Sequence, residues 1–137
     1  MGQYWYPVNL DKREFIHPHK LGSGLKLWEQ LANHPGTGAA LIALCAAMPK
    51  PRGGGDLEEA PDVIGRWAGD RIALVGDYAK DSDLPPEFVA SRIYDMCHEG
   101  GAYTDISRLV APVLEKELTG RFVPDLPTPE WRNWVPG

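Results

Sequence analysis

The pattern of apolar and polar positions predicts two strands near the start of the chain and a third near its middle. Residues 3–10 are rich in aromatic and β-branched side chains, which is typical of a strand, and residues 13–16 follow as its hairpin partner. Because Pro7 has no N–H to donate to a sheet, we expect the first strand at an edge, or with a bulge at this position. The apolar run 72–75 is flanked by glycines and predicts a buried strand.

Four further segments have a helical pattern. Residues 37–48 are apolar almost all round, which predicts a helix deep in the core. Ser23 is placed to cap the first segment, and Pro112 predicts a kink or a late start in the last one. In the other three segments the apolar residues recur at helical spacing: Leu25, Trp28, Leu31 and Ala32; Val89, Ile93, Met96 and Cys97; and Ile106, Leu109, Val110, Val113, Leu114 and Leu118.

Together these elements predict an α+β fold. The sheet is expected to be small and mainly antiparallel, built from the N-terminal hairpin and the strand at 71–76, with about four helices packed on it. We expect one domain over residues 1–122 and a tail over 123–137 that is rich in proline and contains Trp131 and Trp134. No apolar run approaches the roughly 18 residues that a membrane span needs, and no secretory signal pattern is present, so the expected compartment is the cytoplasm.

Acidic side chains are concentrated in the middle of the chain. The formal net charge is −5, and residues 56–105 contain most of the excess of Asp and Glu. An acidic surface disfavours nonspecific binding to nucleic acid and suits either a basic protein partner or simple solubility. Cys45 and Cys97 both lie in apolar helical patterns, so buried free thiols are expected in preference to a disulfide.

His17 and His19 form one candidate metal pair. The proline between them favours an extended backbone over 17–20, in which alternate side chains point the same way. A zinc site needs further ligands, and the available candidates are Cys97, His98 and Asp56. Because no HExxH or paired CxxC pattern is present, two partly exposed histidines without a metal are the simpler interpretation, and no cofactor is predicted.

A glycine-rich loop over residues 53–55 is a candidate anion site. Successive glycines can turn backbone N–H groups toward an anion, and Lys50 and Arg52 lie beside them. The loop lacks the GxxxxGK[ST] pattern of a phosphate-binding loop, so a flexible connection is the competing interpretation. Its candidate binding residues are Arg52, Gly54 and Asp56.

Two Gly-Asp pairs flank the predicted middle strand. Asp70 and Asp77 would lie about 23 Å apart along an extended strand, which excludes a paired-carboxylate acid/base site. Each aspartate could bind a ligand alone, although an aspartate at a strand end usually caps a turn. Their neighbours Trp67 and Arg71 complete the candidates in this segment.

Several motifs in the first part of the chain occur together: residues 3–5 (QYW), 8–12 (VNLDK), 17–22 (HPHKLG), 53–56 (GGGD) and 65–72 (GRWAGDRI). In these motifs the chain resembles a group of small uncharacterised bacterial proteins, and the likeness covers residues 3–78. The resemblance implies no activity and no catalytic residue.

The absence of a strong catalytic pattern leads us to expect a non-catalytic binding or regulatory protein, of the immunity or accessory-factor type. Such a protein would recognise another protein through its surface, with a basic protein as one candidate, rather than nucleic acid or a membrane. Candidate partner-facing residues are Glu58, Glu59, Asp81, Asp83, Trp131 and Trp134. The alternative is a small enzyme or a ligand- or metal-binding domain with a pocket near His17, His19, residues 53–56 and Asp70.

Overall fold

A computed structural model describes residues 2–31, 35–48, 50, 52–54, 57, 60–98 and 101–118, and all elements named below lie within these ranges. Four strands form one sheet: β1 (Trp5–Asn9), β2 (Glu14–Phe15), β3 (Ile72–Gly76) and β4 (Thr104–Asp105). Three α-helices accompany it: α1 (Gly36–Cys45), α2 (Ala90–His98) and α3 (Ser107–Leu118). Four short 3₁₀ helices connect them: Pro18–Leu21, Leu27–Gln30, Asp81–Asp83 and Pro86–Phe88.

The sheet has the strand order β3-β1-β2-β4. β1 pairs antiparallel with both β2 and β3, whereas β2 and β4 are parallel, with Phe15 opposite Asp105. The predicted α+β class is therefore confirmed in outline, but the sheet is mixed. The described part of the chain has three α-helices where about four were predicted.

Pro7 lies in a central strand, so the prediction of an edge strand was wrong. Its neighbours in β1 bond to β3 on one side, as the Leu10 amide does to the Arg71 carbonyl. Pro7 faces the other side, where its carbonyl accepts a hydrogen bond from the Ile16 amide just after the short β2 has ended. The missing N–H of the proline therefore lies beyond the end of β2, where no ladder bond is needed.

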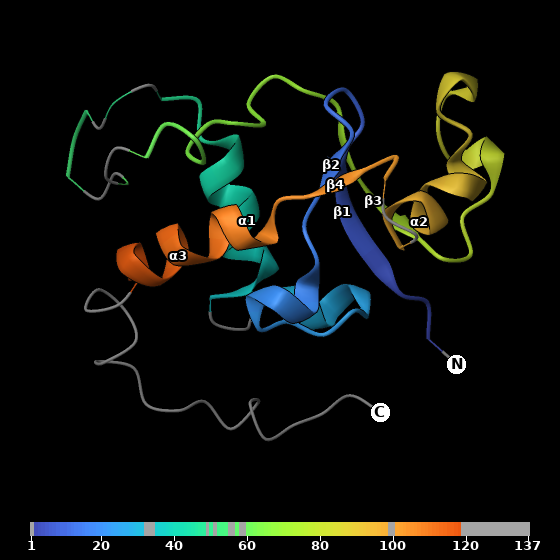
Figure 1. Ribbon diagram of the computed structural model, residues 1–137, viewed down its shortest axis with the longest axis horizontal. Helices are drawn as coiled ribbons and strands as arrows, with labels where there is room; N and C mark the ends of the chain where they lie inside the picture. Colours follow the sequence, from blue (N-terminus) through green and yellow to red (C-terminus); the bar gives the residue numbers. More distant parts are fainter. Residues whose placement is uncertain are drawn as a thin grey trace.

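Two clusters of buried side chains form the core on the two sides of the sheet. One joins α1, α3 and the 60–70 segment, with Leu44, Trp67 and Val110 among its fully buried residues. The other joins the sheet to α2 through Tyr6, Phe15, Ile93 and Cys97 among others. Figure 1 shows α1 and α3 on one side of the strands and α2 on the opposite side.

The first predicted helix, at residues 25–32, is a short 3₁₀ helix instead. Trp28 and Leu31, expected in its apolar stripe, are 76% and 68% exposed, whereas Gln30 is buried. The amide of Gln30 donates hydrogen bonds to the carbonyls of Trp5 and Leu25, which explains why a polar side chain faces inward here. Ser23 caps a different helix, since its hydroxyl accepts a hydrogen bond from the Thr37 amide at the start of α1.

The remaining helices differ from the sequence pattern at single residues. Val89 has a left-handed backbone (φ 48°) and is 46% exposed, so α2 begins only at Ala90 and Val89 is outside its apolar stripe. α3 begins at Ser107 and includes Pro112 within its length, so there is no late start. Arg108, whose carbonyl would accept from residue 112, is exposed, so water can replace that bond.

Both cysteines are free thiols, but only Cys97 is buried; Cys45 is exposed on α1, contrary to expectation. The nearby Ile42 is also exposed, so α1 is buried along one side only. None of the described helices has the length and apolarity that a membrane crossing requires. The predicted tail with Trp131 and Trp134 lies outside the described residues.

Candidate functional site

A cavity of about 480 Å³ opens between the end of α2, the 101–105 segment and the chain that leaves β2. Its lining combines aromatic rings with two imidazoles and an ion pair, a mixture typical of a ligand site. The residues that supply these groups are Tyr6, Phe15, His17, Lys20, His98 and Asp105.

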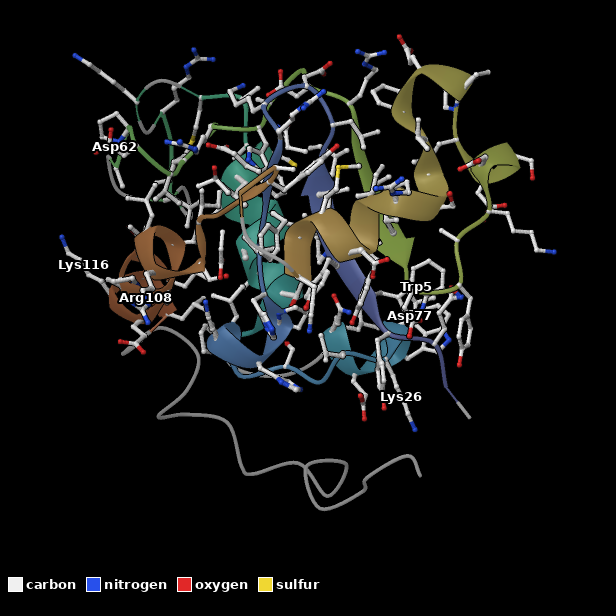
Figure 2. The ribbon with its side chains drawn as sticks, turned by 45° about the vertical axis from the view of Figure 1, so that its right-hand side comes forward. Trp5, Lys26, Asp62, Asp77, Arg108 and Lys116 are labelled. Atoms are coloured by element: carbon white, nitrogen blue, oxygen red, sulfur yellow. The ribbon has the colours of Figure 1, made fainter. Side chains whose placement is uncertain are left out.

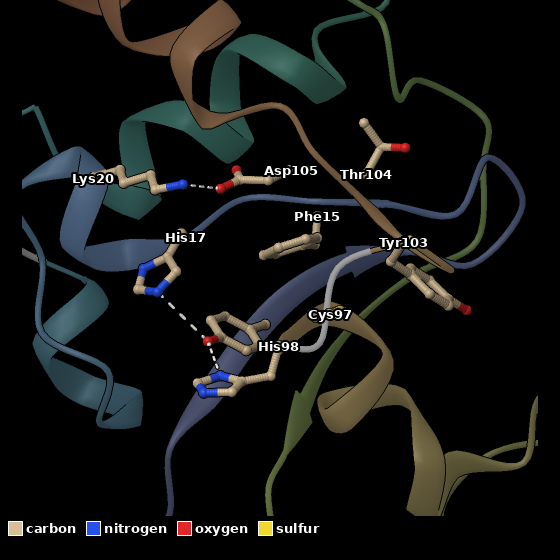
Figure 3. A pocket seen from close by; sticks show the side chains of 10 residues that line it. Phe15, His17, Lys20, Cys97, His98, Tyr103, Thr104 and Asp105 are labelled. Atoms are coloured by element: carbon tan, nitrogen blue, oxygen red, sulfur yellow. Dashed lines mark hydrogen bonds and ion pairs between the residues drawn. The ribbon is translucent and has the colours of Figure 1, made fainter.

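The sheet brings these residues together from distant parts of the sequence. The parallel pairing of β2 with β4 places Asp105 opposite Phe15, and the Ile106 amide donates to the Phe15 carbonyl. The next backbone amide after this strand pair, that of His17, donates to the Ser107 hydroxyl at 2.6 Å. This bond fixes the chain where it leaves β2, so the His17 ring faces the end of α2, where His98 lies (Figure 3).

Tyr6 is the buried centre of the site. Its side chain is 1% exposed and stacks on Tyr94, with 4.6 Å between ring centroids. The hydroxyl oxygen lies 3.5 Å from Nε2 of His17 and 3.2 Å from Nδ1 of His98. Burial, reinforced by Tyr94, raises the pKa of Tyr6 above its ordinary value, so the phenol stays neutral and has one proton to donate.

The direction of these hydrogen bonds follows from the backbone beside His17. The His19 amide donates to Nδ1 of His17 at 3.2 Å, so this nitrogen is an acceptor without a proton. Burial also lowers the pKa of His17, and a neutral ring then has its proton on Nε2. His17 Nε2–H then donates to Tyr6, and Nδ1 of His98, 3.2 Å from the Tyr6 oxygen, is placed to accept the Tyr6 proton, which leaves the His98 proton on Nε2. Dashed lines in Figure 3 mark these two contacts.

The second polar group of the pocket is the ion pair of Lys20 and Asp105. The ammonium lies 2.5 Å from Oδ2 of Asp105, and the other carboxylate oxygen accepts a hydrogen bond from the Ser107 amide. Burial alone would raise the pKa of Asp105, but the hydrogen bonds from Lys20 and Ser107 outweigh it and the pKa is lowered. Asp105 is therefore ionised at neutral pH, and both of its oxygens already have donors.

Cys97 also lines the cavity but is not an activated nucleophile. Burial raises the pKa of its thiol to about 12, so almost no thiolate is present at neutral pH. Within the described ranges, no group of three or more His, Cys, Asp or Glu side chains could hold a metal ion. The proposed metal pair gains no support, because Nδ1 of His17 accepts the His19 amide.

The state of His17 predicts how stability depends on pH. Because the folded-state pKa lies below the ordinary value of 6.5, the unfolded chain binds this proton first. The stabilisation is complete above the ordinary pKa and is lost as the pH falls toward the folded-state value. We expect wild type to lose more stability than His17→Gln between about pH 7.5 and about pH 5.5, measured by urea unfolding. Parallel curves for the two proteins would contradict a neutral, half-buried His17.

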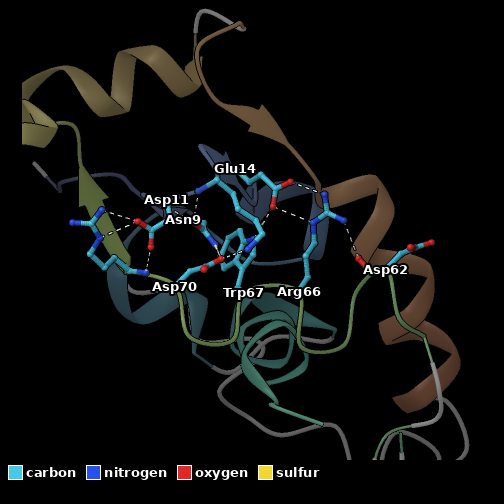
Figure 4. Close-up of polar contacts among 9 residues, drawn as sticks. Asn9, Asp11, Glu14, Asp62, Arg66, Trp67 and Asp70 are labelled. Atoms are coloured by element: carbon cyan, nitrogen blue, oxygen red, sulfur yellow. Dashed lines mark hydrogen bonds and ion pairs between the residues drawn. The ribbon is translucent and has the colours of Figure 1, made fainter. Parts of the chain in front are cut away.

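Trp67, a predicted binding residue, lies in the core on the other side of the sheet. It is fully buried, and its indole N–H donates to Oε1 of Glu14 at 3.0 Å. Arg66 donates to both oxygens of the same carboxylate, and also to the Asp62 carbonyl (Figure 4). Gly65, which precedes Arg66, has a left-handed backbone with φ 78°. A Cβ at this position would lie 2.8 Å from the Ala46 carbonyl oxygen, so the position favours glycine. The GRW motif thus packs the 60–70 segment against the end of α1.

The predicted residues around β3 are in separate contacts away from the cavity lining. Asp70 accepts hydrogen bonds from the side chains of Asn9 and Lys12 (Figure 4). Arg71 pairs with Asp11 and Glu87 and lies over the ring of Phe88. Asp77 lies beside Trp5 (Figure 2) and accepts a hydrogen bond from the Tyr4 amide. Each of these side chains joins β3 or its flanks to a neighbouring segment.

The other predicted residues do not line the cavity. His19 contributes its backbone amide, as described above, while its side chain is exposed. Arg52 and Gly54 are exposed, and both Asp81 and Asp83 accept hydrogen bonds from backbone amides. The remaining candidates lie outside the described residues: Asp56, Glu58, Glu59, Trp131 and Trp134.

Sequence reasoning missed three central residues of the site, Tyr6, Lys20 and Asp105. Tyr6 reads as one more apolar residue of a strand, because nothing local indicates that its hydroxyl meets two histidines. Lys20 and Asp105 are separated by 85 positions and meet only through the parallel pairing of β2 with β4. A two-residue strand such as β4 has no distinctive pattern.

Comparisons with known proteins do not extend this picture. The resemblance of residues 3–78 to small bacterial proteins stays a prediction, and the site is interpreted from its own geometry. No family model matches the chain, and neither a curated protein nor a solved structure matches it significantly.

Proposed function

We propose that the protein is a non-catalytic binding protein whose recognition site is the cavity around Tyr6. The single observation that supports this most is the hydrogen-bond chain from the His19 amide through His17 and Tyr6 to His98. It holds two imidazoles and a phenol in fixed orientations on the wall of a cavity of about 480 Å³. Pre-oriented polar groups above aromatic rings suit selective binding of a small molecule.

Binding is preferred over catalysis because three titratable groups of the lining, those of His17, Cys97 and Tyr6, are not activated. Both ring nitrogens of His17 are engaged, so this ring has no free lone pair for a general base. Cys97 is held as a thiol and Tyr6 as a phenol. A cytoplasmic location belongs to the same proposal, since two free cysteines fit a reducing compartment.

The experiment is a fragment screen followed by protein-observed NMR. A ligand of the cavity should shift the amide signals of His17, Cys97 and Thr104 and leave those of Asp62 and Arg66 unchanged. His98→Ala should weaken the best fragment by about ten-fold or more, the loss expected for one good hydrogen bond from a fixed donor. Arg108→Ala is the matched control, because Arg108 is an exposed residue of α3 and not part of the cavity lining (Figure 2). A screen in which no fragment shifts the cavity signals would contradict the proposal.

Recognition of a protein partner is a second candidate, favoured by the exposure of large apolar side chains. Trp28 is 76% exposed and Leu31 is 68% exposed, and tryptophan is enriched among the residues that dominate binding interfaces. The acidic surface is harder to test by charge reversal at Asp81. Its carboxylate accepts a hydrogen bond from the Ser91 amide at the start of α2, so the substitution would also disturb the fold there. Binding of a partner at Trp28 and Leu31 should be lost with Trp28→Ala and retained with His98→Ala, which is the reverse of the result expected for a ligand of the cavity.

A further inference from the structure

The chemistry that the cavity presents to a ligand is determined by one backbone amide. In a free histidine either ring nitrogen can have the proton, and the two forms interconvert. Here the His19 amide occupies Nδ1 of His17, so the His17 proton has a single favourable place, on Nε2 toward Tyr6, and we take Nδ1 of His98, 3.2 Å from the Tyr6 oxygen, as the acceptor of the Tyr6 proton. If the hydrogen bonds ran in the opposite direction, His17 would have its proton on Nδ1. That proton would then point at the N–H of His19, so two donors would face each other.

As a consequence, His98 presents a donor. Its Nδ1 accepts the Tyr6 hydroxyl, and its Nε2–H makes no hydrogen bond within the described part of the chain. The side chain is exposed at the end of α2, so a ligand can reach it. With Nδ1 accepting from Tyr6, His98 offers its Nε2 hydrogen to a ligand atom and cannot accept one there without breaking its bond to Tyr6.

Lys20 adds hydrogen-bond donors to the same lining, within an ion pair with Asp105 that has no net charge. An ammonium group has more N–H donors than its contact with Asp105 uses, and the Lys20 side chain is 44% exposed. Each oxygen of Asp105 already accepts one hydrogen bond, from Lys20 or from the Ser107 amide, so its carboxylate is partly satisfied before a ligand binds. A cationic ligand would have to compete with Lys20 for the carboxylate.

Resting on the function proposed above, we infer that the ligand of this cavity has an oxyanion, a carboxylate or a phosphate, bound by His98 Nε2–H and by Lys20. The rings of Phe15 and Tyr6, both buried, line the apolar side of the cavity against which the rest of the ligand would lie. Charge-assisted hydrogen bonds to an oxyanion are about twice as strong as neutral ones, so the charged group dominates recognition.

Matched probes test the class of ligand directly. Benzoate, benzamide and benzamidine have nearly the same shape and are an anion, a neutral molecule and a cation, while phenyl phosphate replaces the carboxylate by a phosphate. Benzoate or phenyl phosphate should bind at least about ten-fold more tightly than benzamide, by NMR titration of the cavity signals, and benzamidine should bind more weakly than both. The tighter of the two anions identifies the oxyanion. Benzamide or benzamidine binding as tightly as the anions would overturn the inference while leaving a binding cavity intact.

A pair of variants tests the role of His98. The amide nitrogen of glutamine can replace Nε2 as a donor, whereas asparagine is too short to reach that position. His98→Gln should retain anion binding to within a few-fold, and His98→Asn should lose about ten-fold. Long-range ¹H–¹⁵N spectra of the wild-type imidazoles should show the proton of both His17 and His98 on Nε2. A proton on Nδ1 of His98, or equal binding by the two variants, would overturn the assignment.

Discussion

Glu14→Gln should lower the free energy of unfolding by about 3 kcal/mol, the lower end of the cost of breaking a buried ion pair from one side. Glu14 is 8% exposed, and its carboxylate accepts hydrogen bonds from Arg66 and from the indole of Trp67. Burial by itself raises the pKa of Glu14, but these donors outweigh it, so the pKa is lowered and the group is ionised. A glutamine amide would place N–H groups against the donors of Arg66.

The lower end of the range applies because the Arg66 side chain is 30% exposed and partly hydrated. Glu87→Gln is the matched control, since it breaks an ion pair of the same type with Arg71 on the surface, where Glu87 is 61% exposed. That change should cost less than about 1 kcal/mol. Urea unfolding of both variants measures the difference. Equal losses would mean that the Glu14 network contributes no more than a surface contact.

The fold was predictable where local pattern and tertiary packing agree. The hairpin, β3 and the three α-helices all lie in segments with a strong strand or helix pattern. The prediction failed at residues 25–32, because helical spacing of Trp28 and Leu31 does not show whether a core exists to receive them. Gln30 is inward-facing there because two backbone carbonyls need a donor, and that need is set by the fold rather than by the sequence nearby.

The site was predictable only in part, and for a related reason. His17 was identified as a candidate from its spacing to His19, and His98 as a possible companion. What the spacing could not show is that the His19 contribution comes from its backbone, since the ring is exposed while the amide fixes Nδ1 of His17. Tyr6 meets His98 across 92 positions, through packing of α2 on the sheet. Such contacts depend on topology, and the parallel β2–β4 pair was not predicted.

α1 shows the same limit most clearly, because its sequence is apolar almost all round. The structure gives it a buried side with Ala40 and Leu44 and an exposed side with Ile42 and Cys45. Sequence periodicity cannot choose between these sides when both are apolar. Two nearby residues of one helix therefore offer a direct test of the packing.

Leu44→Ala should lower the free energy of unfolding by about 2–5 kcal/mol, as expected when a fully buried leucine leaves a cavity. Leu44 is 0% exposed and belongs to the cluster with Trp67 and Val110, so several neighbours would have to move to fill the space. Ile42→Ala, at a position 70% exposed, should change stability by no more than about 0.5 kcal/mol, because the side chain lost was mostly in water and alanine favours helix. Urea unfolding of the two variants gives the comparison. If Ile42→Ala costs as much as Leu44→Ala, both sides of α1 are covered in solution, and the exposed side would then have to be in contact with another segment or another molecule.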